Sequence, residues 1–166
     1  MTTNYERAFA EHPEVYAAWD ALNGALKARM DLRRYELATL AAARRLRSSY
    51  CSLGHGSVLI ERFGEPVVEI ARDPVAAGLD EVDVAVMRFA ERVVDDATSI
   101  AESDHAALRA LGLTDADIMD VALAAAARCF FAKTLDAMCV RPDARYRELD
   151  ADVLDALVVG RPIAEE

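Results

Sequence analysis

Apolar residues recur at steps of three and four along most of the chain. Between residues 13 and 30, the residues with this spacing are Val15, Trp19, Leu22, Leu26 and Met30. This spacing places them on one face of an α-helix. The same pattern predicts further helices over 32–46, 80–97, 103–111, 114–138 and 148–159. Residues 65–74 predict a connection with at most a helical turn, because prolines stand near both of its ends.

Strand signals are weak. The runs VVEI and LVV are too short to build a sheet, and no Gly-, Pro- or Ser-rich stretch is long enough to divide the chain. A further helix begins at Ser48 or Ser49, both of which are residue types that cap helices. We therefore predict one all-α domain over residues 1–166, with six to seven helices.

The helix over 114–138 has clear end signals and a very apolar middle. Thr114 followed by Asp117 is a variant of the capping box. Gly112 suits the end of the helix before it, and Pro142 prevents continuation beyond it. Because the run ALAAAARCFF is the most apolar of any predicted helix, we expect this helix to be central.

The charge balance excludes several classes of protein. The chain has 19 basic and 29 acidic residues, a net charge of −10 and a pI of about 4.8. Nucleic-acid binders normally carry a basic patch, so we expect no nucleic-acid partner. The first residues are charged throughout, and no apolar run approaches the roughly 20 residues that span a bilayer. We expect no secretory leader, no membrane segment and a cytoplasmic location.

Cysteine and glycine usage narrows the chemistry. Cys51, Cys129 and Cys139 are too few and too scattered for a disulfide framework, which is typical of a reducing compartment. The sequence contains neither G-x-G-x-x-G nor G-x-x-x-x-G-K-[ST], so no phosphate-binding loop is expected. A zinc site needs about four ligands, and only one Cys-His pair is present. We expect neither a metal nor a cofactor.

One short stretch carries the residues most suited to chemistry. Cys51 and His55 are four residues apart, so on a helix they share one face, with Ser48 three residues before Cys51. In a helix that starts at Ser48 or Ser49, Cys51 lies in the first turn, where free N–H groups favour a thiolate. His55 then accepts the thiol proton or stabilises the thiolate. Glu36, on the preceding helix, orients His55 directly or through a water.

These residues also have an ordinary interpretation. A free cysteine is often only a small buried hydrophobic residue, and a Cys-His pair at this spacing arises by chance in many helices. Gly54 and Gly56 flank His55, and each glycine costs a helix up to about 1 kcal/mol relative to alanine. They indicate either a close approach of another helix or a substrate, or a helix that is broken at this point.

A basic cluster and a tyrosine border the same stretch. Arg44, Arg45 and Arg47 precede Cys51 in an otherwise acidic chain. We predict that Arg44 and Arg47 bind an anionic substrate or favour the thiolate. The alternative is that they form the solvated end of a helix, where cations are favoured. Tyr50 is a candidate for lining a substrate pocket, or a packed aromatic residue.

The motif resembles that of the alkylhydroperoxidase D-like, or carboxymuconolactone decarboxylase, family, which is marked by E-x11-C-x2-C-x3-H. Glu36, Ser48, Cys51 and His55 match every spacing, except that Ser48 stands where the first cysteine belongs. The resemblance extends over roughly residues 10–145, including the "LGLTD" start of a later helix. It implies a compact all-α domain that assembles as a homo-oligomer, as a trimer or hexamer, or as a dimer.

The resemblance also implies an activity and roles for the residues. Complete members are thiol-dependent peroxidases, so Cys51 resembles the thiolate that attacks a small hydroperoxide, and His55 and Glu36 resemble its proton relay. The first cysteine of the motif resolves the sulfenic acid as a disulfide. Ser48 can hydrogen-bond the thiolate but cannot form that disulfide. We therefore expect reduction by an external thiol or a redox protein.

Two other functions stay open from the sequence. In the first, the chain is a decarboxylase-type lyase that acts on a small anionic substrate, with the arginines holding a carboxylate and His55 or Glu36 moving a proton. In the second, it is a non-catalytic redox-sensing oligomer, because one cysteine without a resolving partner also suits a sensor. Cys129 and Cys139 are interpreted as core or half-buried thiols.

Overall fold

The computed structural model describes residues 2–165. Over these residues it forms nine α-helices and two short 3-10 helices, with no strand, and this confirms the predicted all-α fold. The α-helices are α1 (Asn4–Ala8), α2 (Pro13–Arg29), α3 (Leu32–Arg45), α4 (Ser49–Phe63), α5 (Val67–Arg72), α6 (Glu81–Asp96), α7 (Glu102–Ala110), α8 (Asp115–Ala137) and α9 (Ala151–Leu157). The 3-10 helices are η1 (Ala97–Ser99) and η2 (Ala144–Glu148).

The helices predicted from apolar spacing begin and end within a few residues of their predicted limits, and two short helices are additional. Helix α1 begins with a capping box between Thr3 and Glu6, a signal that the sequence carries. Helix α5 fills the predicted connection with six residues. It forms because Val67, Val68 and Ile70 are buried, and α5 packs against α9.

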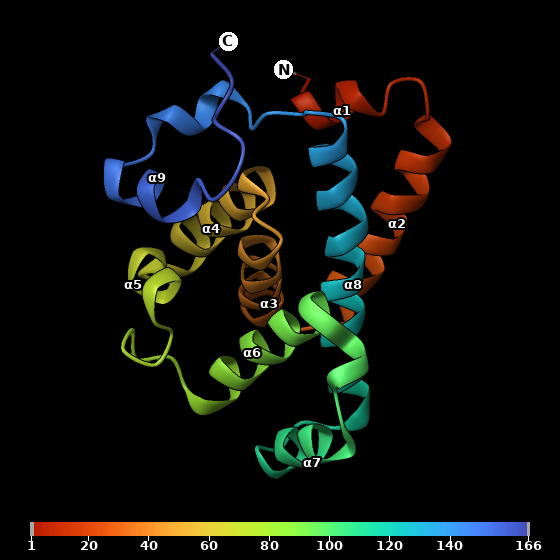
Figure 1. The fold of residues 1–166 in the computed structure, drawn as a ribbon, viewed down its shortest axis with the longest axis vertical. Coiled ribbons are helices and arrows are strands. Elements are labelled where there is room, and N and C mark those ends of the chain that lie inside the picture. Colours follow the sequence, from red (N-terminus) through yellow and green to blue (C-terminus); the bar gives the residue numbers. More distant parts are fainter. Residues whose placement is uncertain (1, 166) are drawn as a thin grey trace.

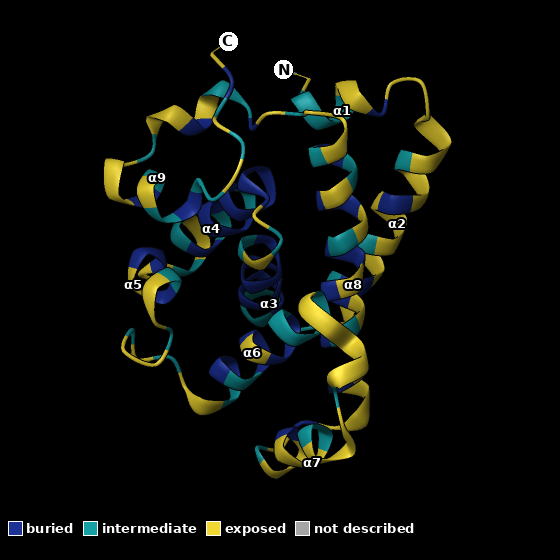
Figure 2. Ribbon diagram, viewed as in Figure 1, coloured by how far each residue is buried: buried dark blue, intermediate teal, exposed yellow. Residues whose placement is uncertain are grey.

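Helix α3 is the centre of the fold. It packs mainly against α4, α6 and α8, which surround it in Figure 1. Every residue from Tyr35 to Ala43 is buried, as the dark ribbon of α3 in Figure 2 shows. Four of these nine positions are alanine, and small side chains let neighbouring helices approach closely on several sides. The helix that carries Glu36 is therefore held on all sides by the core.

Helix α4 follows α3 after a tight turn and continues unbroken past its two glycines. It ends at Gly64, which has a left-handed backbone with φ of 65°. A Cβ at Gly56 would overlap the Leu157 side chain of α9. Of the two predicted reasons for the glycines, close approach of another helix is therefore the one that applies at Gly56.

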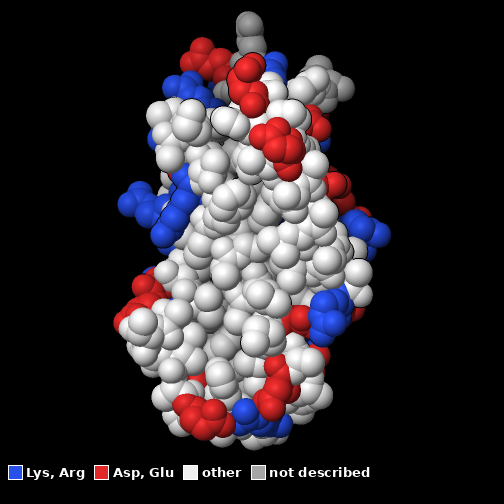
Figure 3. Space-filling view, turned by 90° about the vertical axis from the view of Figure 1, so that its right-hand side faces the viewer, with Lys and Arg blue, Asp and Glu red and all other residues white. Residues whose placement is uncertain are grey.

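Helix α8 shows the predicted capping box between Thr114 and Asp117, and Gly112 ends α7 with φ of 93°. The prediction that α8 is central is only partly right. One face packs on α3, α6 and α2, but the opposite face is exposed along its length. Figure 3 shows this side of the molecule as a broad surface largely free of charged residues, with Lys, Arg, Asp and Glu mainly around its edges.

The segment after α9 returns to the turn between α3 and α4. The Gly160 N–H donates to Ser49 Oγ at 2.8 Å, and Arg47 in the turn has a left-handed backbone with φ of 57°. A Cβ at Gly160 would collide with the backbone carbonyl of Arg47. Close backbone approach at Gly160 therefore fixes the start of α4, two residues before Cys51.

We predict that Gly160→Ala lowers the free energy of unfolding by about 1–3 kcal/mol, because the added methyl must displace a backbone carbonyl. The measurement is urea unfolding of the full chain, with stability read from the midpoint at constant slope. Gly24→Ala is the matched control. Gly24 lies within α2 with nothing near its missing Cβ, so alanine should stabilise by up to about 1 kcal/mol. Equal effects of the two substitutions would contradict the assigned contact.

Candidate active site

A cavity of about 270 Å³ opens among α1, α2, α3, α4, α8 and η2. Its wall combines aromatic rings with charged and polar side chains. The lining residues are Tyr5, Tyr16, Trp19, Asp20, Asn23, Lys27, Glu36, Tyr50, Cys51, Gly54, His55, Val58, Arg128, Phe131, Arg145 and Tyr146. Three of the four residues predicted to be catalytic line this cavity, and so does Tyr50.

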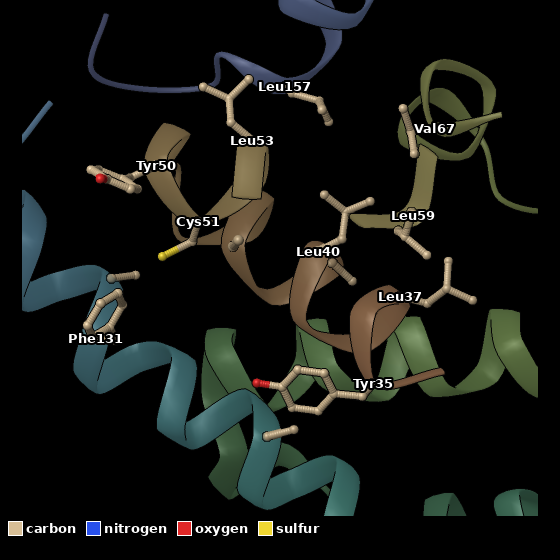
Figure 4. Close-up of a cluster of buried hydrophobic side chains, with 14 of the residues drawn as sticks. Tyr35, Leu37, Leu40, Tyr50, Cys51, Leu53, Leu59, Val67, Phe131 and Leu157 are labelled. Atoms are coloured by element: carbon tan, nitrogen blue, oxygen red, sulfur yellow. The ribbon is translucent and has the colours of Figure 1, made fainter. Parts of the chain in front are cut away.

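Cys51 occupies the third position of α4 and is 3% exposed. Figure 4 shows its sulfur directed away from α3, toward α8 and Phe131. The first turn of a helix presents N–H groups without partners inside the helix, and these favour an anion nearby. On the other side of the sulfur, Arg128 Nη1 donates to Cys51 Sγ at 3.6 Å. The sulfur thus lies between a helix N-terminus and a guanidinium.

Glu36 and His55 contact each other directly across the α3–α4 interface. Glu36 Oε2 lies 2.5 Å from His55 Nδ1, and both residues are buried. Lys27 Nζ lies 3.6 Å from the other carboxylate oxygen of Glu36. The carboxylate therefore bridges a ring nitrogen and a half-exposed ammonium group.

The surroundings fix the protonation of this pair. Burial and the nearby Arg128 charge lower the pKa of His55 to about 4, against the opposing effect of Glu36. Burial raises the pKa of Glu36, but its hydrogen bond to His55 and the charges of His55, Lys27 and Arg128 outweigh burial and lower it overall. At neutral pH the carboxylate is ionised and the imidazole is neutral. Nδ1–H donates to Glu36, which leaves the Nε2 lone pair as a base.

Arg128 is a site residue that sequence reasoning missed. It is 4% exposed and lines the cavity from α8. Burial lowers the pKa of its guanidinium, but the neighbouring Cys51 and Tyr35 raise it overall, so the group stays charged. The signal was present in the sequence, because Arg128 is the one charged residue within ALAAAARCFFA. A lone arginine in such an apolar run is rarely buried without a specific partner.

Two tyrosines tie the cavity wall together. The Tyr35 hydroxyl donates to Asn23 Oδ1 at 2.5 Å and accepts from Arg128 Nη2 at 3.3 Å. The Tyr50 hydroxyl donates to Asp143 Oδ2 at 2.5 Å. Burial raises the pKa of both phenols, so both remain neutral donors. Tyr50 therefore lines the cavity as predicted, with its hydroxyl engaged by the segment that leads into η2.

The structure does not place Ser48 against the thiol. Ser48 is fully buried but does not line the cavity, and the side chain that donates to Cys51 is Arg128. The predicted contact assumed that both residues are helical. Ser48 instead precedes α4 with an extended backbone, φ −93° and ψ 98°, so the three-residue spacing does not put its hydroxyl on the face of Cys51.

Arg44 and Arg47 also lie away from the cavity. Arg44 Nη1 donates to the Ala71 carbonyl of α5 at 2.5 Å, and Arg47 Nε donates to the Val159 carbonyl at 3.4 Å. Arg44 thus contacts α5, and Arg47, in the turn after α3, contacts the segment after α9. The predicted anion site at these arginines is corrected: the cations that line the cavity are Lys27, Arg128 and Arg145.

The other two cysteines do not line the cavity. Cys129 is half-buried on α8, and burial raises the pKa of its thiol. Cys139 is exposed just beyond the end of α8. All three cysteines are free thiols. No second thiol therefore lines the cavity beside Cys51.

Within residues 2–165, no group of three or more His, Cys, Asp or Glu side chains is arranged to hold a metal ion. In the same part of the chain, every helix is too short or too polar to cross a membrane.

The fold is shared with solved structures. An alkylhydroperoxidase AhpD core, an uncharacterized peroxidase-related protein from Ralstonia eutropha JMP134, is 24% identical, with a TM-score of 0.80 over 87% of this chain and 78% of that chain. An uncharacterized peroxidase-related protein from Silicibacter sp. TM1040 is 23% identical, with a TM-score of 0.81 over 89% and 80% of the two chains. No family model and no curated protein matches the sequence. These likenesses show that the chain has the alkylhydroperoxidase D-like fold.

We predict that the protein loses stability as the pH falls from 6.5 toward 4. A histidine with an ordinary pKa of 6.5 in the unfolded chain and about 4 in the fold takes up its proton first in the unfolded state. The contribution of the neutral His55 to the free energy of unfolding is complete above pH 6.5 and amounts to no more than about 3 kcal/mol. The loss of stability is measured by urea unfolding at steps between about pH 7.5 and about pH 4.

The variant His55→Gln removes the titrating ring, so its stability should depend less on pH over this range. His12→Gln is the control, because His12 is exposed and its side chain makes no hydrogen bond at the start of α2. If His55→Gln and the wild type lose stability in parallel, the buried neutral imidazole is wrongly assigned.

Proposed function

We propose that this chain, as one alkylhydroperoxidase D-like domain, is a thiol-dependent hydroperoxide reductase with Cys51 as its single reactive cysteine. The observation that carries the proposal is the placement of Cys51 in one cavity with the buried Glu36–His55 pair. A nucleophile, a neutral base and a carboxylate that orients the base form the arrangement used to activate thiols. The peroxidase-related neighbours support the same class of reaction.

The reaction begins with the transfer of the Cys51 proton to His55 Nε2. The thiolate then attacks the distal oxygen of the hydroperoxide, the S–O bond forms, and the O–O bond breaks with its electron pair leaving on the alkoxide. His55 returns the proton to that alkoxide, which leaves as an alcohol. Sulfur is oxidised by two electrons to the sulfenic acid, and the peroxide bond is reduced. Glu36 holds the ring orientation throughout and stabilises the transient imidazolium.

Reduction of the sulfenic acid requires thiols from outside the chain. One external thiol forms a mixed disulfide with Cys51 and releases water, and a second releases Cys51 as a thiol and leaves as a disulfide. Ser48 cannot form a disulfide, and neither Cys129 nor Cys139 lines the cavity. A low-molecular-weight thiol or a redox protein is the reductant that we propose.

The cavity favours a small organic hydroperoxide as substrate. Its volume of about 270 Å³ is far larger than hydrogen peroxide needs, since one water occupies about 30 Å³ of liquid. Rings of Trp19, Tyr16 and Phe131 offer an apolar surface, while Cys51 and His55 lie in the opposite wall on α4. The decarboxylase alternative needs Arg44 and Arg47 to hold a carboxylate, and neither lines this cavity.

We predict that Cys51→Ala abolishes the reduction of cumene hydroperoxide by dithiothreitol. The substitution removes the atom that attacks the peroxide, so the rate should fall to the uncatalysed level. The measurement is the consumption of hydroperoxide over many turnovers by the full-length protein. Cys139→Ala and Cys129→Ala are the controls, because these thiols do not line the cavity, and both variants should retain the wild-type rate.

Each contrary outcome has a distinct meaning. Normal turnover by Cys51→Ala would rule out the cysteine mechanism and reopen proton-transfer chemistry. Oxidation of Cys51 by one equivalent of peroxide, without turnover under any reductant, would instead indicate a redox sensor. Intact mass after peroxide treatment with a sulfenic-acid trap, followed by peptide mapping, separates these cases.

We also propose that a second copy of the chain covers the outer face of α2 and α8. On each helix, exposed apolar residues recur at steps of three and four, the spacing of a helix-packing seam. The two seams are Val15, Ala18, Leu22 and Ala25 on α2, and Met119, Leu123, Ala126 and Phe130 on α8. Helices that are apolar on every side are normally buried. A second copy would therefore give α8 the central position that its sequence predicts.

The size of this face is compatible with a dimer. Helices of 17 and 23 residues rise about 1.5 Å per residue and pack about 9 Å apart. They present a face on the order of 500–600 Å² in projection, against about 800 Å² per partner in a typical stable interface. Small alanines in both seams allow the close approach that helix pairs need.

We predict that Leu123→Glu converts the assembled protein to a monomer, because it places a charge at the centre of the seam. Light scattering coupled to size exclusion gives the mass directly. Val75→Glu is the control, since Val75 is also an exposed apolar residue but lies between α5 and α6, on another part of the surface. A monomeric wild type, or dissociation by both variants alike, would contradict the assigned face.

A further inference from the structure

Arg128 is a buried cation without a carboxylate partner. Its polar contacts are Cys51 Sγ at 3.6 Å and Tyr35 Oη at 3.3 Å, and it forms no ion pair with any carboxylate in residues 2–165. Other partly buried arginines have oxygen partners: Arg33 pairs with Asp83, and Arg44 donates to the Ala71 carbonyl. An isolated buried charge is strongly unfavourable, so Arg128 requires an anion close to it.

Among the contacts of Arg128, only Cys51 can supply this charge. Tyr35 remains a neutral phenol, because burial raises its pKa. The Glu36 carboxylate is near enough for the Arg128 charge to lower its pKa, but it contacts His55 and Lys27 and not Arg128. The Cys51 thiolate is therefore the group whose formation neutralises Arg128.

Arg128 also has a donor to spare. Its Nε is buried and has no hydrogen-bond partner among the described residues. The guanidinium carbon lies 5.5 Å from the Trp19 ring centre and 5.7 Å from that of Phe131, so the rings hold the cation in place without using its hydrogens. Because Nε is enclosed, the donor that an oxygen on the Cys51 sulfur would meet is Nη1, which already contacts this sulfur.

We propose that Arg128 is a catalytic residue that holds Cys51 as a thiolate and then binds the oxygen that peroxide transfers to sulfur. This inference rests on the proposed peroxidase function. In the step concerned, the thiolate electron pair forms the S–O bond, the O–O bond breaks, and the negative charge passes to the leaving alkoxide, which His55 protonates. The transferred oxygen stays on sulfur as sulfenate or sulfenic acid, and it accepts a hydrogen bond from Arg128 Nη1, the nitrogen that contacts the sulfur.

The arrangement has a consequence for the sulfenate. The planar guanidinium contacts the Cys51 sulfur through Nη1 and Tyr35 through Nη2 from one fixed position, which the single point charge of a lysine does not reproduce. Arg128→Lys should therefore keep part of the thiolate reactivity but lose more of the peroxide turnover. Arg128→Met fills similar space without charge and should lose both.

The test compares two alkylating reagents on the folded protein. Iodoacetate is an anion and iodoacetamide is neutral, and both react with the thiolate. Peptide mass mapping gives the rate at Cys51, with the exposed Cys139 as internal reference. In the wild type, Cys51 should prefer iodoacetate to iodoacetamide by about tenfold more than Cys139 does, as a charge near 4 Å permits.

Arg128→Met should greatly reduce this preference, with Lys27 and Arg145 still lining the cavity, and should slow iodoacetamide at Cys51 by about tenfold, because an unpaired thiolate forms less readily. A general loosening of the structure would instead speed both reagents equally. Arg45→Met is the control, since Arg45 carries an exposed ion pair with Asp95 and its loss should leave both rates unchanged. The circular dichroism spectrum and thermal midpoint of each variant establish that it is folded.

The outcomes separate this inference from the function on which it rests. Wild-type peroxide turnover with no anion preference at Cys51, or an unchanged preference in Arg128→Met, overturns the role of Arg128 and leaves the peroxidase standing. A preference that depends on Arg128, with no turnover of any hydroperoxide, overturns the peroxidase and keeps Arg128 as the partner of the thiolate. If Arg128→Met does not fold, the role of Arg128 is tested by the iodoacetate preference of Cys51 in the wild type and by whether Arg128→Lys reduces that preference.

Discussion

The buried contact between Glu36 and His55 is the constraint on which the rest of the site depends. A carboxylate in the interior is stable only when its oxygens are paired, so α3 and α4 must lie close enough for Nδ1–H to reach it. The alanines of α3 allow this approach, and the return of residues 158–160 to the α3–α4 turn fixes where α4 begins. The same packing that completes the core therefore sets the orientation of the base and places Cys51 in the first turn of its helix.

Charge inside the cavity is opposite to that of the chain as a whole. The protein carries a net charge of −10, yet Lys27, Arg128 and Arg145 all line one small cavity. The acidic groups outside repel anions at long range, while the cations inside stabilise a negative charge once it forms. This combination suits a neutral substrate whose reaction creates an anion, as a hydroperoxide does when it meets a thiolate.

The sequence predictions are most accurate where the residues involved are close together in the chain. Glu36, Cys51 and His55 come from two consecutive helices, so their spacing and the resemblance of the motif already pointed to a shared site, and all three line one cavity. Ser48 failed because its position depended on a helix boundary, and one residue outside a helix changes the direction of a side chain. Arg128 contacts Cys51 across 77 residues, and no local pattern can predict such a meeting. The apolar sequence of α8 predicts a central helix, but one of its faces is exposed. Apolar residues predict only that a helix is covered, and a second chain can cover it as well as the same chain can.

The burial of Cys51 also bears on the two kinds of external reductant that we propose. Its side chain is 3% exposed, and its sulfur faces α8 across a cavity of about 270 Å³. A redox protein must bring its own cysteine to within bonding distance of Sγ, which requires part of the wall formed by α2 to move aside. A thiol no larger than the proposed hydroperoxide needs no such movement. The static cavity therefore favours a small thiol, and a protein reductant requires that the N-terminal helices open. Since α2 also carries half of the apolar face assigned to a second copy, association of two chains would hold α2 closed and strengthen the preference for the small thiol.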